Sequence, residues 1–420
     1  MTRRLLTGNA AAAWGARLAR VDYVPAFPIT PQTEILETLG RWIDARELDA
    51  RLVFLESEHS MLTAAGAAAA TGVRVFTATS SQGLLYAMEM LFTIPGWRAP
   101  FVLVNVSRGL ATPITLEPDH TDVLAARDAG FLQIHCASAQ EVLDAVVMAH
   151  RWGEDARVRL PVLVNYDGFH VSFTREPVAI PEPAAVDAFL PPFDPGAVRF
   201  RASQPVSQAV AVLGGSPYSY FRYEVHLAAR AALQVYDGVA ADFAARCGRA
   251  WPAVETHRTE DAEVVLYMIG SLATRARDAV DRLRDAGLRV GLVRPRLLRP
   301  LPVDAIRAAL RGVAAVAVLD QNLSMGMGGV LHAELAAALA GDRDAPRTLA
   351  SFVGGLGGRE VTVAELARMA DETLSAARDG RELAPRLLYT AQELRELRTL
   401  QTLAHAERAP LGGADPGGGP

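Results

Sequence analysis

The feature that most constrains the fold is a pattern repeated through the first 175 residues. Short apolar runs alternate with polar or glycine-bearing turns and with helical segments. Continuous apolar runs separated by helices are typical of parallel strands that are covered on both faces. The pattern predicts an α/β fold with an open, mostly parallel sheet. Its runs are VDYVPAF (21–27), RLVFL (51–55), VRVFTA (73–78), PFVLVNV (100–106) and LPVLVNY (160–166).

A second α/β block follows, with apolar runs in AEVVLYMIG, LRVGLVRPRLLRPLP and VAAVAVLDQN. We expect a first domain over residues 1–258 and a second over residues 259–380. Residues 177–207 are proline-rich and are predicted to cross the surface as an extended connection, and the segment that follows them to residue 258 reads as helical. Residues 381–420 should contain a charged amphipathic helix over 391–406 and a disordered-looking Gly/Pro tail.

Composition excludes several classes of site. All 42 basic residues are arginines, so a Walker A phosphate loop, a pyridoxal Schiff base and a lysine general base are excluded. The net charge of −5 gives no nucleic-acid footprint. Cys136 and Cys247 form no CxxC pair, so this chain alone cannot hold a four-cysteine iron–sulfur cluster or zinc site.

The same features indicate a compartment. Two isolated cysteines fit a reducing cytoplasm, and no apolar run is long enough to span a bilayer. The opening MTRRLLTGNAAAAWGA is a poor export signal, because Gly8, Asn9 and Gly15 interrupt its apolar part. We therefore expect a cytoplasmic protein that binds neither membrane nor nucleic acid.

Polar residues follow four of the predicted strands. In an open parallel sheet, ligands bind outside the carboxyl ends of the strands. The segments found there are PITPQTE (28–34), ESEHS (56–60), TSSQG (79–83) and SRG (107–109). They bring carboxylate, hydroxyl, amide and guanidinium groups to one edge, which predicts a binding site there.

Most of these residues also have structural interpretations. Thr30 and Pro31 fit an N-cap and a first helical position, although a helix start also offers N–H groups to an anion. Glu56 and Glu58 could favour the positive end of the following helix, and Ser80 and Ser81 could cap another.

Arg108 ends a run that should be buried, so it needs an anionic partner, either a structural carboxylate or a ligand. PDHTD (118–122) matches no established metal-ligand spacing and reads better as a solvated or interface loop. His59 is likewise not expected to be a catalytic base.

Several motifs, in order over residues 7–375, resemble the α subunit of the multi-subunit 2-oxoacid:ferredoxin oxidoreductases, the family of pyruvate:ferredoxin oxidoreductase (pyruvate synthase). The first block contributes FPITPQTEI, ESEHS, TATSSQGL, NVSRGL, DHTD with RDAGF, and LPVLVNYDGF. The second contributes DAEVV, RPRLLRPLP, LDQNLSMGMGG and GLGGREVT.

The resemblance implies a thiamine diphosphate enzyme. The first domain would be of the pyrimidine-binding type, and the second would resemble the C-terminal domain of transketolase. The family's pyrimidine-activating glutamate falls on Glu58, a catalytic and cofactor-binding role, and its substrate-contacting threonine and arginine fall on Thr30 and Arg108. A carboxyl group that is hydrogen-bonded to N1′ of the aminopyrimidine favours the imino tautomer, whose nitrogen removes the C2 proton. Arg108 offers a bidentate guanidinium for the carboxylate of the 2-oxoacid.

The resemblance also implies partner chains. No GDG…N segment that would hold Mg²⁺ and the diphosphate is visible, so both are assigned to a β subunit, and [4Fe–4S] clusters are assigned to partner subunits. With gamma and delta (ferredoxin-like) subunits, the complex would decarboxylate a 2-oxoacid, pyruvate by default. Its products with coenzyme A would be acyl-CoA, CO2 and reduced ferredoxin.

Two features depart from the family pattern. Gln321 stands where relatives commonly carry a basic residue, which could alter a subunit contact, and the tail beyond about residue 380 is longer than expected. Glu56 matches no catalytic position of the family. Two other functions stay open: a subunit of another thiamine-dependent enzyme, such as a branched-chain 2-oxoacid dehydrogenase β subunit or a transferase, and a non-catalytic scaffold. The 2-oxoacid itself (pyruvate, 2-oxoisovalerate or an aryl glyoxylate) is also open.

Overall fold

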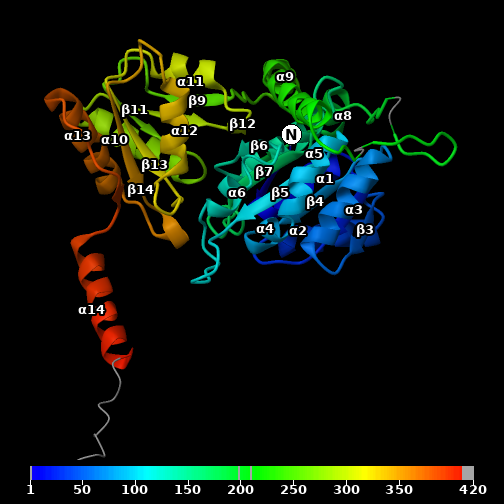
Figure 1. The fold of residues 1–420 in the computed structure, drawn as a ribbon, viewed down its shortest axis with the longest axis horizontal. Coiled ribbons are helices and arrows are strands. Elements are labelled where there is room, and N and C mark those ends of the chain that lie inside the picture. Colours follow the sequence, from blue (N-terminus) through cyan, green and yellow to red (C-terminus); the bar gives the residue numbers. More distant parts are fainter. Residues whose placement is uncertain (1, 197–198, 209–210, 409–420) are drawn as a thin grey trace, which may run out of the picture.

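The computed structural model describes residues 2–196, 199–208 and 211–408, so the predicted Gly/Pro tail from residue 409 on lies outside the described residues. Two main sheets organise it (Figure 1). The first has the order β12–β6–β7–β5–β4, and all its pairs are parallel except β12 with β6. Its strands are β4 (Phe76–Thr79), β5 (Val102–Ser107), β6 (Leu132–His135), β7 (Val162–Asp167) and β12 (Leu297–Arg299).

A parallel pair, β2 (Tyr23–Ala26) with β3 (Arg51–Phe54), lies beside the first sheet, because a parallel bridge joins Tyr23 to Val75 at the start of β4. All five apolar runs of the first block therefore contain strands. Strand β6 was missed, since its sequence LQIH is short and half polar.

The first sheet is buried on both faces. Alternate residues of β5 enter different cores: Val102 and Val104 pack in one core with α1 and α7, and Leu103 packs in another with α3 and α5. This two-sided burial explains why the strands read as continuous apolar runs. The helices of this part are α1 (Gly8–Leu18), α2 (Thr33–Asp44), α3 (Glu58–Ala70), α4 (Gln82–Tyr86), α5 (Met88–Trp97), α6 (Thr121–Ala125), α7 (Ala139–Gly153), α8 (Pro183–Phe189) and α9 (Ser216–Cys247).

The second main sheet has the order β15–β14–β13–β10–β11–β9, with β9 alone antiparallel to its neighbour. Its core is also two-sided, because Val264 and Val265 of β10 belong to different apolar clusters. The strands are β9 (Val254–His257), β10 (Val264–Tyr267), β11 (Val290–Pro295), β13 (Ala315–Asp320), β14 (Thr348–Val353) and β15 (Arg386–Leu387). The helices are α10 (Leu272–Asp285), α11 (Val303–Leu310), α12 (Val330–Leu339), η1 (Leu356–Gly358) and α13 (Val363–Asp379). The predicted α/β class is confirmed for both sheets.

The proline-rich segment differs from its prediction. Its first residues form β8 (Glu176–Ile180), which pairs antiparallel with β1 (Thr2–Leu6), and α8 then buries Val186 and Phe189. The extended-connection prediction is therefore wrong for this part, because the prolines stand at an edge strand and at a helix start, where a missing N–H is tolerated. The helical predictions are confirmed by α9 and by α14 (Ala391–Arg408), which projects away from the second sheet (Figure 1).

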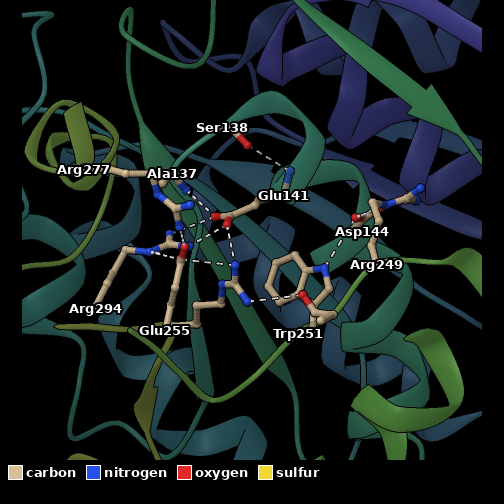
Figure 2. Close-up of polar contacts among 11 residues, drawn as sticks. Ala137, Ser138, Glu141, Asp144, Arg249, Trp251, Glu255, Arg277 and Arg294 are labelled. Atoms are coloured by element: carbon tan, nitrogen blue, oxygen red, sulfur yellow. Dashed lines mark hydrogen bonds and ion pairs between the residues drawn. The ribbon is translucent and has the colours of Figure 1, made fainter. Parts of the chain in front are cut away.

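Ion pairs join helix α7, which packs in the core of the first sheet, to strands β9 and β11 of the second sheet. Glu141 of α7 accepts from Arg294 of β11 at 2.8 and 2.5 Å, and Arg294 Nε donates to Glu255 of β9 at 2.8 Å (Figure 2). Arg296 contacts both carboxylates, and Arg277 of α10 contacts Glu255. Burial opposes the charge on Glu141, but Arg294 and Arg296 outweigh it and lower its pKa to about 2.

A second junction lies where the carboxyl ends of both sheets meet. His120 Nε2 lies 2.6 Å from Asp167 Oδ1 at the end of β7, and Asp167 Oδ2 accepts from the N–H and hydroxyl of Ser271. The turn before Ser271 needs glycine, since Gly270 has φ +71° and an added Cβ would lie 2.8 Å from His120 Cε1. Within the described residues no helix is both long and apolar enough to cross a membrane.

Candidate functional site

Glu58 is the first residue of α3, and three residues separate it from the end of β3. Ser57 precedes it as the N-cap, and the Ser57 hydroxyl accepts from Ser60 N–H at 3.2 Å. The Glu58 side chain is only 5% exposed, and no side chain among the described residues donates a hydrogen bond to its carboxyl group. Burial raises its pKa. The site therefore holds a carboxyl group that is poised to share a proton with a ligand.

Glycine at position 83 gives this carboxyl group its room. A Cβ on Gly83 would lie 2.4 Å from Glu58 Oε1 and 2.6 Å from Thr79 Oγ1. Thr79 Oγ1 is itself buried without a hydrogen-bond partner among the described residues. The TSSQG segment after β4 therefore forms one wall against Glu58.

Arg108 lies on the other side of the same segment. Its Nη2 donates to Gln82 Oε1 at 3.1 Å, and its side chain is 7% exposed. No carboxylate of the described residues lies within ion-pair distance of Arg108, and its Nε is buried without a partner. Burial lowers the pKa of Arg108, while the charge of Asp122 opposes that effect. The sequence allowed two anionic partners for Arg108, a structural carboxylate or a ligand. Among the described residues, no structural carboxylate lies within ion-pair distance of it.

The segment between Glu58 and Arg108 is held in a strained backbone conformation. Ser81 has φ 51° and ψ −120°, a combination that costs on the order of 1–3 kcal/mol for a non-glycine residue. Asp122 accepts from Ser81 N–H at 3.0 Å and from Asn105 Nδ2 at 3.0 Å, and it also accepts from Ser107 Oγ at 2.5 Å. These bonds fix the TSSQG turn to the ends of β5 and α6. Such strain persists where the surroundings over-determine it.

The capping interpretation of Ser81 is not supported, because its side chain makes no capping hydrogen bond to α4. The interpretation of PDHTD as a solvated or interface loop is wrong in its first alternative, because His120 is 1% exposed and Asp122 is fully buried. The segment lies at an interface inside the chain: His120 N–H donates to the carbonyl of Gln321, which follows β13 of the second sheet, and Asp122 accepts from Ser81 N–H of the TSSQG turn. A sequence window cannot show this burial, since the partners lie tens of residues away.

Thr30 is exposed and lies three residues before α2 begins at Thr33, so its predicted N-cap position is wrong. Pro31 stays beside the site's edge, because its Cγ lies 3.1 Å from the Cβ position of Gly168, which follows β7. The structure thus brings Glu58 and Arg108 together across Gln82 and Gly83, and it leaves Thr30 at the rim.

The remaining candidates lie outside this cluster. Glu56 is exposed and accepts from Ser60 Oγ, which lowers its pKa, and His59 pairs with Glu89 at 3.3 Å on the surface. Gln321 is buried inside this chain, where its Nε2 donates to the carbonyl of Gly355 at 3.0 Å. No group of three or more His, Cys, Asp or Glu side chains in the described part of the chain is arranged to hold a metal ion.

Comparisons with known proteins identify the family. Residues 14–238 match the family "Pyruvate flavodoxin/ferredoxin oxidoreductase, thiamine diP-bdg", and residues 262–366 match "Pyruvate:ferredoxin oxidoreductase core domain II". Two solved structures share the fold. A 2-oxoglutarate:ferredoxin oxidoreductase from Magnetococcus marinus aligns with TM-score 0.66 and 19% identity over 89% of this chain and 65% of that chain. A split-gene transketolase aligns with TM-score 0.52 and 13% identity over 88% of this chain and 98% of the other.

Relatives of known name cover nearly the whole chain. Pyruvate synthase subunit PorA of Methanothermobacter thermautotrophicus is 40% identical over 373 residues, which are 89% of this chain and 96% of the relative. Ketoisovalerate oxidoreductase subunit VorA of Pyrococcus horikoshii is 38% identical over 380 residues, 90% of this chain and 95% of the relative. The resemblance stated from the motifs is confirmed, and the chain belongs to the family of α subunits of the 2-oxoacid:ferredoxin oxidoreductases, thiamine diphosphate proteins of multi-subunit complexes.

Proposed function

We propose that this chain supplies the pyrimidine-binding half of a thiamine diphosphate site in a pyruvate-oxidising complex. The observation that carries the proposal is a pair of buried groups in the described chain: Glu58 is a carboxyl group without a side-chain donor, and Arg108 is a guanidinium whose Nε has no partner and which meets no carboxylate. These two groups fit the cofactor and a 2-oxoacid, respectively. Thiamine diphosphate, when bound, supplies the nucleophilic carbon that attacks the 2-oxo group.

Glu58 would hold a proton between its carboxyl group and N1′ of the aminopyrimidine. Burial raises its pKa, which favours the protonated form of the carboxyl group. The narrow space at Gly83 fixes the carboxyl group against the TSSQG turn. Position and proton affinity thus support the same role.

Arg108 would bind the carboxylate of the 2-oxoacid, with Thr30 contacting the same substrate from the rim. A single guanidinium favours a monocarboxylate, so pyruvate is the proposed substrate. Mg²⁺ and the diphosphate would be held by a β subunit, and [4Fe–4S] clusters by the other partner subunits. Electrons would pass to ferredoxin, coenzyme A would accept the acyl group, and the complex would work in the cytoplasm.

The test is to purify the complex with its co-expressed partner subunits and measure acceptor reduction that depends on coenzyme A. The panel contains pyruvate, 2-oxoisovalerate, phenylglyoxylate and 2-oxoglutarate. Pyruvate should give the highest kcat/KM. A higher value for 2-oxoisovalerate would shift the assignment toward the ketoisovalerate oxidoreductases, to which the chain is also similar. A preference for 2-oxoglutarate would refute the single-cation pocket.

A further inference from the structure

We infer that Gln82 is a second substrate-binding residue, whose amide N–H group donates to the carboxylate of the 2-oxoacid held by Arg108. The inference rests on the proposed function and extends it to a residue for which neither the motifs nor the family descriptions give a role.

The Gln82 amide can be oriented from its contacts. Arg108 Nη2, which can only donate, lies 3.1 Å from Gln82 Oε1, and Ser81 Oγ lies 2.7 Å from the same oxygen. Turning the amide around would bring two donors, Gln82 Nε2 and Arg108 Nη2, against each other. The oxygen therefore faces Arg108, and Nε2 is the end of the amide that makes no bond to Arg108 or Ser81.

The Nε2 end of the amide lacks an acceptor from the described part of this chain. Gln82 Nε2 is buried and has no hydrogen-bond partner in the described residues, and the same is true of Arg108 Nε. Two buried donors without acceptors are costly, because each loses its water without gaining a partner. A carboxylate of a bound 2-oxoacid has two oxygens and can satisfy donors from both residues.

The backbone supports a binding role rather than a packing role for Gln82. It stands directly after Ser81, whose strained conformation is held by Asp122, and directly before Gly83, which lies against Glu58. The turn thus fixes Gln82 between the proposed proton-holding group and the proposed carboxylate-binding group. A residue needed only to fill space would not require a strained turn to hold it there.

The experiment compares Gln82→Met with the unchanged protein and with Arg108→Lys in the assembled complex. Methionine keeps the volume of glutamine but cannot donate. We expect KM for pyruvate to rise roughly 10- to 100-fold with kcat nearly unchanged, as for lost uniform binding of a charged group. Hydrogen–deuterium exchange at C2 of bound thiamine diphosphate, measured without pyruvate, should stay unchanged.

Two results would overturn the inference: a KM within twofold of the unchanged protein, or slower C2 exchange, which would assign Gln82 to the cofactor. If Arg108→Lys raises KM and Gln82→Met does not, only the role of Gln82 fails. If the unchanged complex does not oxidise 2-oxoacids, the proposed function fails first. Gln82→Glu is the second variant: its carboxylate would pair with Arg108 and repel pyruvate, so KM should rise further than in Gln82→Met, and a lower KM would contradict the inference.

Discussion

Glu58 is a carboxyl group whose surroundings act in opposite directions on its charge. Burial raises its pKa, while its place in the first turn of α3 favours the anion. Neighbouring Glu56 is exposed and has a lowered pKa through its bond from Ser60. Two acids separated by one residue thus differ in the property that the proposed chemistry requires.

The pair gives a matched test at the residue scale. Glu58→Gln keeps the shape of the side chain but cannot share a proton with N1′, so C2 hydrogen–deuterium exchange of bound thiamine diphosphate should slow by roughly 10²–10⁴-fold. Glu56→Gln should leave exchange unchanged, since its side chain faces solvent. Exchange is measured by NMR after acid quench in the assembled complex. Slower exchange in Glu56→Gln alone would mean that the wrong carboxyl group is assigned.

The sequence predicted some of these residues for physical reasons and missed others. Glu58 and Arg108 stand at strand ends, where the carboxyl edge of a parallel sheet gathers polar groups, and the motif resemblance then gave them roles. Gln82 and Asp122 were not identified as site residues. Their importance depends on which atoms meet across the turn, and local composition does not contain that information.

At the scale of elements, α3 and α4 form the site by approaching closely. The approach depends on Gly83, where a Cβ would lie 2.4 Å from Glu58 Oε1. Gly83→Ala should therefore displace the Glu58 carboxyl group and slow C2 exchange by at least about tenfold, at an overpacking cost of roughly 1–3 kcal/mol in stability. The control is Gly96→Ala in α5, where nothing lies within 4 Å of the added Cβ.

The two alanine variants should differ both in the rate of C2 exchange and in melting temperature. Gly96→Ala should keep exchange unchanged and leave the melting temperature equal or higher, because alanine is favoured over glycine inside a helix. Equal exchange in Gly83→Ala and the unchanged protein would show that the α3–α4 distance does not control Glu58.

Elements with strong patterns were predicted well, and those defined by distant partners were not. The long apolar strands and the helices α9 and α14 follow from periodicity and length. Strand β6 and the pair of β1 with β8 did not, because short or edge strands carry little pattern of their own. The proline-rich segment was predicted to be extended because it has little apolar pattern of its own. In the structure its helix α8 packs into the core of the first sheet.

At the scale of the whole molecule, the His120–Asp167 pair lies at the junction of the two sheets, because Asp167 also accepts from Ser271, which follows β10 of the second sheet. Burial lowers the pKa of His120, but Asp167, helped by Asp119 and Asp122, outweighs it and the pKa is raised. Burial raises the pKa of Asp167, but His120 and Ser271 lower it to about 2. The facing His135 has its pKa lowered to about 3, chiefly by burial, and stays neutral.

The directions of these pKa shifts define the pH range in which the His120–Asp167 pair stabilises the folded chain. The contribution of His120 is fully present below its ordinary pKa of 6.5 and is lost as pH rises through the raised value. The contribution of Asp167 to stability is present above its ordinary pKa of 3.8 and is lost as the pH falls toward 2. His120→Gln should therefore lower stability most between about pH 4 and 6, by roughly 1.5–3 kcal/mol for a hydrogen bond between charged groups.

The measurement is the melting temperature of the chain from about pH 4 to 9, with His59→Gln as the control. His59 pairs with Glu89 on the surface, where an ion pair contributes little. The deficit of His120→Gln should shrink at alkaline pH, and that of His59→Gln should stay near zero. A deficit that does not vary with pH would mean that His120 is neutral in the folded chain.

The whole chain is also expected to need its partners. No metal-binding group occurs in its described residues, and the sequence lacks the GDG…N segment. Calorimetry on the isolated chain with Mg²⁺ and thiamine diphosphate should give no binding at micromolar concentrations, whereas the assembled complex should bind. Micromolar affinity of the isolated chain would place the diphosphate site here.

The strand β12 has a consequence for anyone who divides this protein. It follows β11 of the second sheet in sequence, yet it forms the outer strand of the first sheet beside β6. A fragment ending at the proposed boundary of residue 258 would leave β6 as an open edge and Glu141 without Arg294 and Arg296. Open strand edges recruit other chains, and a buried acid without its cations destabilises the fold. Such a fragment should aggregate, so a shortened chain made for crystallisation or surface display should retain residues through at least Arg299.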